Sequence, residues 1–133
     1  FFATGSDSRE LAESVELIRK HISFYAATAS YAAVMRHHGW DDVGERLVAL
    51  SREGRWEQMP ALVSDAMLDT FAIVGLLNEL PAKLAARYGG LVDAVNVVFG
   101  PPYAALQPRQ RDLFVRLGPV LPALQLIPAA GGR

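Results

Sequence analysis

The sequence contains no cysteine, so disulfide bonds, thiolate metal sites and a cysteine nucleophile are excluded. It also has no surplus of positive charge, because 13 lysines and arginines stand against 14 aspartates and glutamates, for a formal net charge of −1. Binding to nucleic-acid phosphates or to anionic lipid depends on such a surplus. We therefore expect neither nucleic acid nor a membrane surface among the partners of this chain.

Long apolar runs are also missing, since none reaches the roughly 18 residues that a membrane-spanning helix needs. The opening FFATGSDSRE lacks the basic and apolar regions of a signal peptide. We therefore expect a cytoplasmic protein. The chain opens on phenylalanine instead of methionine, which is typical of a segment of a longer protein.

The chain has enough apolar residues to form a core of its own. It has 133 residues, of which 51% are hydrophobic, and a mean hydropathy of +0.17. A chain of this length buries about two thirds of its unfolded surface. One domain is therefore the simplest organisation.

Helix signals dominate the first half of the sequence. A short apolar run ends at Gly5 and predicts a strand, and Asp7 with Glu10 has the spacing of a capping box. Apolar residues then recur at helical spacing up to residue 25, and the small residues of AATAS predict a break. We expect a second helix over 30–38, ended by Gly39. A third helix should start at a capping box of Asp42 and Glu45.

The second half begins with a change of period. The third helix should end at Gly54, and a short helix should follow around Pro60. LDTFAIVG (68–75) and LVDAVNVVFG (91–100) are apolar runs that predict buried strands, and NELPAKLAARY (78–88), capped by Asn78, predicts a helix between them. Strand, helix and strand in this order form a βαβ unit of a parallel sheet. Six of the eight prolines lie in 101–133, so we divide the chain into a domain, 1–100, and an apolar arm, 101–133.

Three stretches together carry a resemblance to a known family. FYAATASYAAVMRHHGW, LSREGRWEQMPALVSDAMLDTFAIVG and LAARYGGLVDAVNVVFG resemble the C-terminal portion of luciferase-like monooxygenases, most of all the branch that uses coenzyme F420. The likeness runs from about residue 3 to residue 99. It departs from the family at GLLNEL, where members often have a Thr-Pro or Ser-Pro turn, and at Ala29, where proline is common.

The resemblance implies an α/β fold: part of a TIM-like (β/α)8 barrel, rich in helix, with a helical insertion. It implies an oxidoreductase or monooxygenase that binds FMN or F420 at the carboxyl mouth of the barrel and acts on a small molecule. This chain would close the barrel and cover the cofactor mouth. Because most of the strands would lie elsewhere, we expect the chain alone to be inactive and to bind no cofactor.

The resemblance also implies a set of cofactor-binding residues. It places Tyr25, Thr28 and Tyr31 in an insertion that overhangs the mouth, where an aromatic ring could line the flavin or substrate pocket. Packing of these amphipathic rings against the core is the alternative. No residue is identified as catalytic, and the flavin itself supplies most of the chemistry in such enzymes.

Other polar groups have two interpretations each. His37 and His38 are adjacent, point about 100° apart on a helix and therefore do not predict a metal site; they fit the end of a helix. Residues 4–8 could cradle a phosphate at a helix N-terminus or simply turn and cap that helix. Lys83 and Arg87 could meet a phosphate or lie in solvent.

A second hypothesis belongs to a different class. Part of a barrel leaves sheet edges and apolar faces uncovered, and such surfaces bind partners. The chain would then be a non-catalytic interaction module that forms a homo-oligomer.

Overall fold

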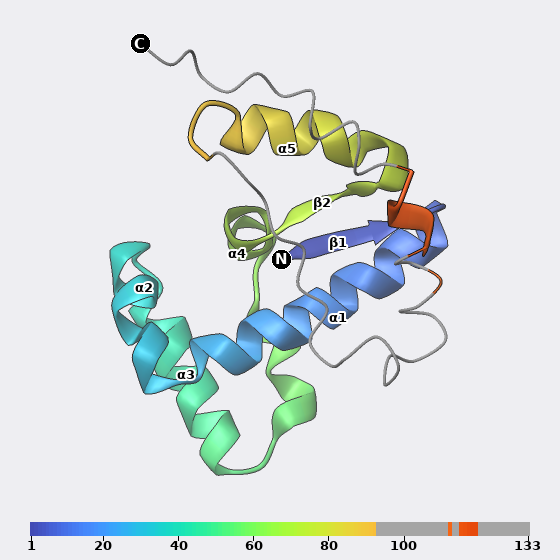
Figure 1. Ribbon diagram of the computed structural model, residues 1–133. Coiled ribbons are helices and arrows are strands. Elements are labelled where there is room, and N and C mark those ends of the chain that lie inside the picture. Colours follow the sequence, from blue (N-terminus) through green and yellow to red (C-terminus); the bar gives the residue numbers. More distant parts are fainter. Residues whose placement is uncertain (93–111, 113–114, 120–133) are drawn as a thin grey trace.

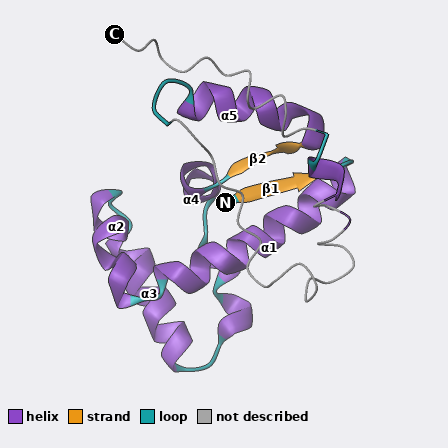
Figure 2. Cartoon of the chain, in the orientation of Figure 1, coloured by secondary structure: helices purple, strands orange, loops and turns teal. Residues whose placement is uncertain are grey.

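A computed structural model describes residues 1–92, 112 and 115–119 (Figures 1 and 2). The helices are α1 (Ser8–Ala26), α2 (Ala32–His37), α3 (Asp41–Arg52), α4 (Asp65–Phe71) and α5 (Leu80–Tyr88), and the strands are β1 (Phe2–Gly5) and β2 (Ile73–Leu76). Four 3-10 turns join them: η1 (Ala29–Tyr31), η2 (Trp56–Gln58), η3 (Pro60–Leu62) and η4 (Leu77–Glu79). Within these residues, no helix is both long enough and apolar enough to cross a membrane.

The two strands pair in parallel, with Phe2 opposite Ile73 and Gly5 opposite Leu76. Figure 1 shows this sheet between α1 and α5. Successive side chains of a strand point to opposite faces. Ala3 accordingly belongs to the large core together with residues of α1, whereas Phe2 packs with the buried leucines of α5.

The predicted fold class is wrong. The described residues are mostly helical, and their sheet has two strands of four residues each, which is too little strand to make part of a TIM-like barrel. The chain between β1 and β2 is helical throughout: α1 is followed by a helical insertion that consists of η1, α2, α3, η2, η3 and α4 (Figure 2). The predicted strand over 91–100 lies outside the described residues from 93 onward, as does the division at residue 100.

The main error concerns the apolar run 68–75. Its first part is helical, because Ser64 caps α4 by accepting a hydrogen bond from the backbone N–H of Met67 at 3.2 Å. This helix buries Met67 and Leu68, and only Ile73–Leu76 remains as strand. A short apolar run fits a buried helix as well as a buried strand, so periodicity could not separate the two.

Several predicted helix ends are confirmed. Asp7 is the N-cap of α1, and its side chain accepts the N–H of Glu10 at 2.8 Å. Gly39 and Gly54 follow the ends of α2 and α3 with φ of 71° and 72°, the left-handed region that favours glycine. Two predicted caps are wrong. Helix α3 already begins at Asp41, without a side-chain cap from Asp42, and α5 begins at Leu80, two residues after Asn78.

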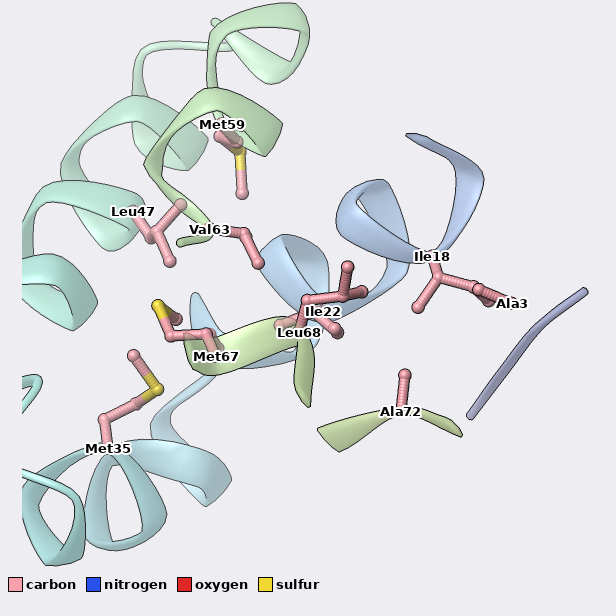
Figure 3. Close-up of a cluster of buried hydrophobic side chains, with 11 residues drawn as sticks. Ala3, Ile18, Ile22, Met35, Leu47, Met59, Val63, Met67, Leu68 and Ala72 are labelled. Atoms are coloured by element: carbon pink, nitrogen blue, oxygen red, sulfur yellow. The ribbon is translucent and has the colours of Figure 1, made fainter. Parts of the chain in front are cut away.

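The large core lies where the insertion meets α1 (Figure 3). Leu47, Met59 and Met67 are its largest fully buried side chains, and they come from three different segments. Ile18 and Ile22 on α1 extend this core to Ala3 and Ala72 at the sheet. A smaller cluster of Ile73, Leu80 and Leu84 lies under α5.

Candidate functional site

The three predicted cofactor-binding residues lie together at the end of α1. The rings of Tyr25 and Tyr31 are 5.4 Å apart, and the Thr28 hydroxyl donates to the Tyr25 carbonyl at 2.8 Å. Tyr25 also contacts the Phe1 ring at 5.8 Å. Both tyrosines are about two-fifths exposed, so they lie at the border of the core.

An apolar hollow opens beside these rings. It is lined by Phe1, Ile22, Tyr25, Ala26, Tyr31, Val34, Met35 and Phe71. Its volume is about 50 Å³, whereas ligand pockets usually measure roughly 300–1,000 Å³. The described residues alone therefore do not enclose a flavin ring, and this hollow could at most be one wall of a larger pocket.

The hollow lies at the amino-terminal edge of the sheet. Helix α1 runs back along β1 in the opposite direction. The Thr4 N–H donates to the Ser14 hydroxyl in the first half of α1, and Phe1 contacts Tyr25 near the end of α1. Phe71, which also lines the hollow, comes just before β2. The resemblance implied a cofactor at the opposite, carboxyl edge. The cofactor-binding role of Tyr25, Thr28 and Tyr31 stays a prediction.

A polar cluster lies at the carboxyl edge, where parallel α/β folds usually bind ligands. The Lys83 ammonium donates to the Val74 carbonyl at 2.7 Å and pairs with Glu79 at 3.3 Å. Glu79 accepts the Leu76 backbone N–H at 3.0 Å. Both side chains fold over Gly75, where a Cβ atom would come within 2.7 Å of the Glu79 carboxylate. Glycine at this position therefore lets the pair reach the strand end.

The electrostatics of this pair argue against proton transfer by Glu79 at neutral pH. Hydrogen bonds from the Leu76 N–H and from Lys83 lower the pKa of Glu79 below its usual value, so this carboxylate stays ionised at neutral pH. An ammonium has three N–H donors, and its two contacts use two of them. Lys83 is 46% exposed, so its remaining donor can reach an anion or a carbonyl oxygen.

The start of α1 lies at the same edge and is already occupied by carboxylates. Glu10 accepts the Ser6 N–H at 2.9 Å, next to the cap formed by Asp7. Arg116 pairs with Glu10 at 3.3 Å and also contacts the Ser6 hydroxyl. These contacts confirm the interpretation of residues 4–8 as a turn and cap, since carboxylates hold the N–H groups that a phosphate would need.

Thr4 adds an unusual group to this edge. Its side chain is buried, and its hydroxyl has no hydrogen-bond partner in the described part of the chain. Thr4 pairs with Gly75 in the sheet, so its side chain lies on the same face as the Glu79–Lys83 pair. A buried hydroxyl without a hydrogen-bond partner lowers the free energy of unfolding, because it loses its hydrogen bonds to water without replacing them.

Arg87 has a structural role. Its guanidinium donates to the carbonyls of Ala72 at 2.7 Å and Asp69 at 2.9 Å, and it also contacts the Thr70 carbonyl. It therefore caps the C-terminus of α4, where a cation is favourable. Lys83 and Arg87 share a helix but lie at different edges of the sheet, so they do not form one phosphate site.

The adjacent histidines close a helix, as predicted. Helix α2 ends at His37, and His38 is its C-cap. The His38 ring stacks on Trp40 at 4.8 Å and meets Phe71 edge-on at 5.7 Å. Nowhere in the described residues do three histidine, aspartate or glutamate side chains gather as metal ligands.

The sequence interpretation missed the Glu79–Lys83 pair. Only Lys83 was considered there, as a phosphate contact together with Arg87, and no residue was identified as catalytic. The signal was present: Glu79 and Lys83 stand four apart within the predicted helix 78–88, a spacing that puts both on one helix face. The glycine before them leaves the space over the strand end open.

Comparison with known proteins finds longer mycobacterial relatives. Uncharacterized protein Rv1360 and Uncharacterized protein MT1405 of Mycobacterium tuberculosis are each 42% identical to the chain over 97 residues, or 73% of its length. Uncharacterized protein Mb1395 of Mycobacterium bovis matches it to the same extent. The chain spans 28% of the length of each relative. No family model matches the chain, and no solved structure matches it.

Proposed function

We propose that this chain is a segment of a longer flavin- or F420-dependent oxidoreductase of the luciferase-like kind. The observation that carries the proposal is the Glu79–Lys83 pair at the carboxyl edge of two parallel strands. Two facts support it further: the sequence resemblance, and the relatives that are more than three times as long as the matched segment. The segment contributes part of a pocket that the rest of the polypeptide completes.

The residues at this edge suit one end of such a cofactor. Lys83 would hold a phosphate or carboxylate group, and Glu79 would keep the ammonium in place by pairing with it. The apolar hollow at the other edge is too small for the ring. The cofactor supplies the hydride or oxygen chemistry, and the protein binds it, orients it and excludes water.

Cofactor affinity of the full-length polypeptide that contains this segment tests the proposal. We expect FMN or F420 to bind, with fluorescence as the readout. Lys83→Met should weaken binding about 10- to 100-fold, because it removes a charge-assisted hydrogen bond. Lys20→Met is the matched control, since Lys20 pairs with Glu57 on the insertion side of α1.

Two results would contradict the proposal in different ways. If the full-length polypeptide binds neither FMN nor F420, the assigned function is wrong. The second result is that the full-length polypeptide binds its cofactor, Lys83→Met leaves the affinity unchanged, and Tyr31→Ala abolishes binding. The cofactor then lies at the amino-terminal edge, and only its placement at Lys83 is wrong.

A further inference from the structure

Three charged side chains of α5 and its N-terminus contact the backbone of β2 in regular order. They are Glu79, Lys83 and Arg87, which stand four residues apart, and we call them the edge stripe. Their partners are backbone groups two residues apart. Arg87 donates to the Ala72 carbonyl at 2.7 Å, Lys83 donates to the Val74 carbonyl at 2.7 Å, and Glu79 accepts the Leu76 N–H at 3.0 Å.

All three backbone groups face away from β1. The Ile73 N–H donates to the Phe1 carbonyl at 2.9 Å, and the register of the two strands continues from there. In a parallel pair, every second residue bonds the neighbouring strand, here Ile73 and Gly75, and the residues between them direct their groups to the other side. The groups of Val74 and Leu76 therefore lie on the outer side of β2. The carbonyl just before Ile73 does so too, because a trans peptide points its C=O opposite its N–H.

Helix and strand advance at matching rates along this side. Figure 1 shows α5 beside β2, and the contacts run in opposite order along the two elements, with Arg87 at the start of β2 and Glu79 at its end. Four helical residues advance about 6 Å, and two residues of a parallel strand advance roughly 6.6 Å. A charged residue at every fourth position of α5 therefore meets every second residue of β2.

Two further features hold the edge stripe against the strand. Leu80 and Leu84 are buried with Ile73, and they fix α5 on the sheet beside the stripe. Gly75 leaves room above the strand, because a Cβ atom there would come 2.7 Å from the Glu79 carboxylate and 2.9 Å from the Lys83 ammonium. The contacts therefore follow from how α5 packs, in addition to the attraction between the charges.

The open side of a strand is a template for pairing with another chain. It presents unpaired N–H and C=O groups, and proteins protect such sides with charged side chains, lysine above all, or by covering them with a helix. The edge stripe does both, because a helix lies along the strand and its charged groups bond the outward backbone groups themselves.

We propose that the edge stripe closes the outer side of β2 to strand addition, so that no strand of a second copy or of another protein extends the sheet there. A joining strand would have to take the outward groups of Val74 and Leu76 from Lys83 and Glu79. Both charged side chains would then lose their backbone partners. The inference does not depend on the proposed function, since its test needs no cofactor.

Amide hydrogen exchange measured by NMR on the 133-residue chain tests the contact at the strand end. Glu79→Ala should accelerate exchange of the Leu76 N–H about 10-fold, because it removes the acceptor. Glu79→Gln keeps an acceptor and should exchange at nearly the wild-type rate. The N–H groups of Ile73 and Gly75, which bond β1, should change less. Equal exchange of the Leu76 N–H in all three proteins would overturn the proposal.

A double variant tests the closure itself. Glu79→Ala/Lys83→Met opens the outer side of β2 and leaves the net charge unchanged. The matched control is Glu57→Ala/Lys20→Met, which removes an ion pair of the same residue types that joins α1 to η2 at 3.9 Å. The first variant should gain intermolecular β-sheet, detected by thioflavin T fluorescence, at concentrations at which the control and the wild type show none.

A conservative variant separates the backbone contacts from the identity of the side chains. Glu79→Gln/Lys83→Arg keeps one acceptor and the N–H donors, so it should resemble the wild type. The proposal is wrong if Glu79→Ala/Lys83→Met keeps its helices by circular dichroism and gains no intermolecular sheet, or if the control variant gains as much. If the double variant loses its helices, exchange at Leu76 in the single variants decides.

Discussion

Thr4 and Thr28 show how the surroundings of a hydroxyl group determine its effect on stability. The Thr4 hydroxyl is buried without a partner in the described residues, whereas the Thr28 hydroxyl donates to the Tyr25 carbonyl. Valine has nearly the shape of threonine but no hydroxyl. Thr4→Val should therefore raise the free energy of unfolding by about 1 kcal/mol, and Thr28→Val should lower it by a similar amount.

Urea denaturation of the two variants measures this difference. The opposite signs serve as an internal control, because both substitutions remove the same group. If Thr4→Val destabilises the protein as much as Thr28→Val does, the Thr4 hydroxyl has a partner, and its assignment as an unpaired group is wrong.

Carboxylates at the strand ends make stability depend on pH. Backbone hydrogen bonds lower the pKa values of Asp7, Glu10 and Glu79 below their ordinary values of 3.8, 4.5 and 4.5. A lowered pKa in the folded state means that the unfolded state binds protons first. The contribution is therefore complete above about pH 4.5 and is lost as the pH falls through the lowered values.

Glu79→Gln tests this pH dependence. Glutamine can still accept the Leu76 N–H but does not titrate, so the variant should lose less stability than the wild type between pH 6 and pH 3. Chemical denaturation at several pH values gives the free energies. Identical pH profiles for the two proteins would show that Glu79 does not contribute to acid unfolding.

At the scale of whole elements, Arg19 fastens α1 to the segment that leads into α4. Its guanidinium contacts the Val63 carbonyl and the Asp65 carboxylate, and its side chain is only 17% exposed. Arg19→Ala should lower the free energy of unfolding by about 2 kcal/mol, the range for hydrogen bonds to charged groups. Arg19→Lys should retain part of this, because an ammonium lacks the forked geometry.

The control for Arg19 is another arginine of the same helix. Arg9 is 77% exposed and pairs with Glu13 at 3.8 Å, so Arg9→Ala should change stability by less than about 1 kcal/mol. Thermal or urea unfolding compares the two variants. Equal effects would show that the Val63 and Asp65 contacts add nothing to stability.

Sequence patterns predicted the elements that carry their own local signals. Helix α1 has an N-cap at Asp7 and a clear apolar period, and the glycines after α2 and α3 mark real helix ends. The run 68–75 has no such signal of its own, because its helical part depends on Ser64, which lies outside the run. The predicted fold class was wrong for the same reason. Apolar runs were interpreted as strands of a larger sheet, and the helical share of the chain between β1 and β2 was underestimated.

The candidate site shows the same limit. Tyr25 and Tyr31 flank one break between helices, and their rings lie 5.4 Å apart, but their cofactor-binding role stays a prediction. The sequence could not predict at which edge of the sheet these two tyrosines lie, because their position depends on how α1 packs back on β1. The Glu79–Lys83 pair depends on the turn η4, which sets α5 over the end of β2.

At the scale of the whole molecule, two unequal hydrophobic clusters divide the structure. The large core joins α1 to the insertion, whereas α5 rests on the small cluster of Ile73, Leu80 and Leu84. Regions with fewer buried apolar contacts open locally at lower free energy than the core. We therefore expect α5 to open without unfolding of α1.

Two leucine truncations test this division, because Leu84 and Leu47 are both at most 2% exposed but lie in different clusters. Leu47→Ala should lower the global free energy of unfolding by about 2–5 kcal/mol. Leu84→Ala should mainly loosen α5. Hydrogen exchange followed by mass spectrometry should then show faster exchange in 80–88 and little change in 8–26 for Leu84→Ala, but faster exchange in both for Leu47→Ala. If Leu84→Ala accelerates exchange in α1 as much as in α5, the two clusters unfold as one unit, and the proposed division is wrong.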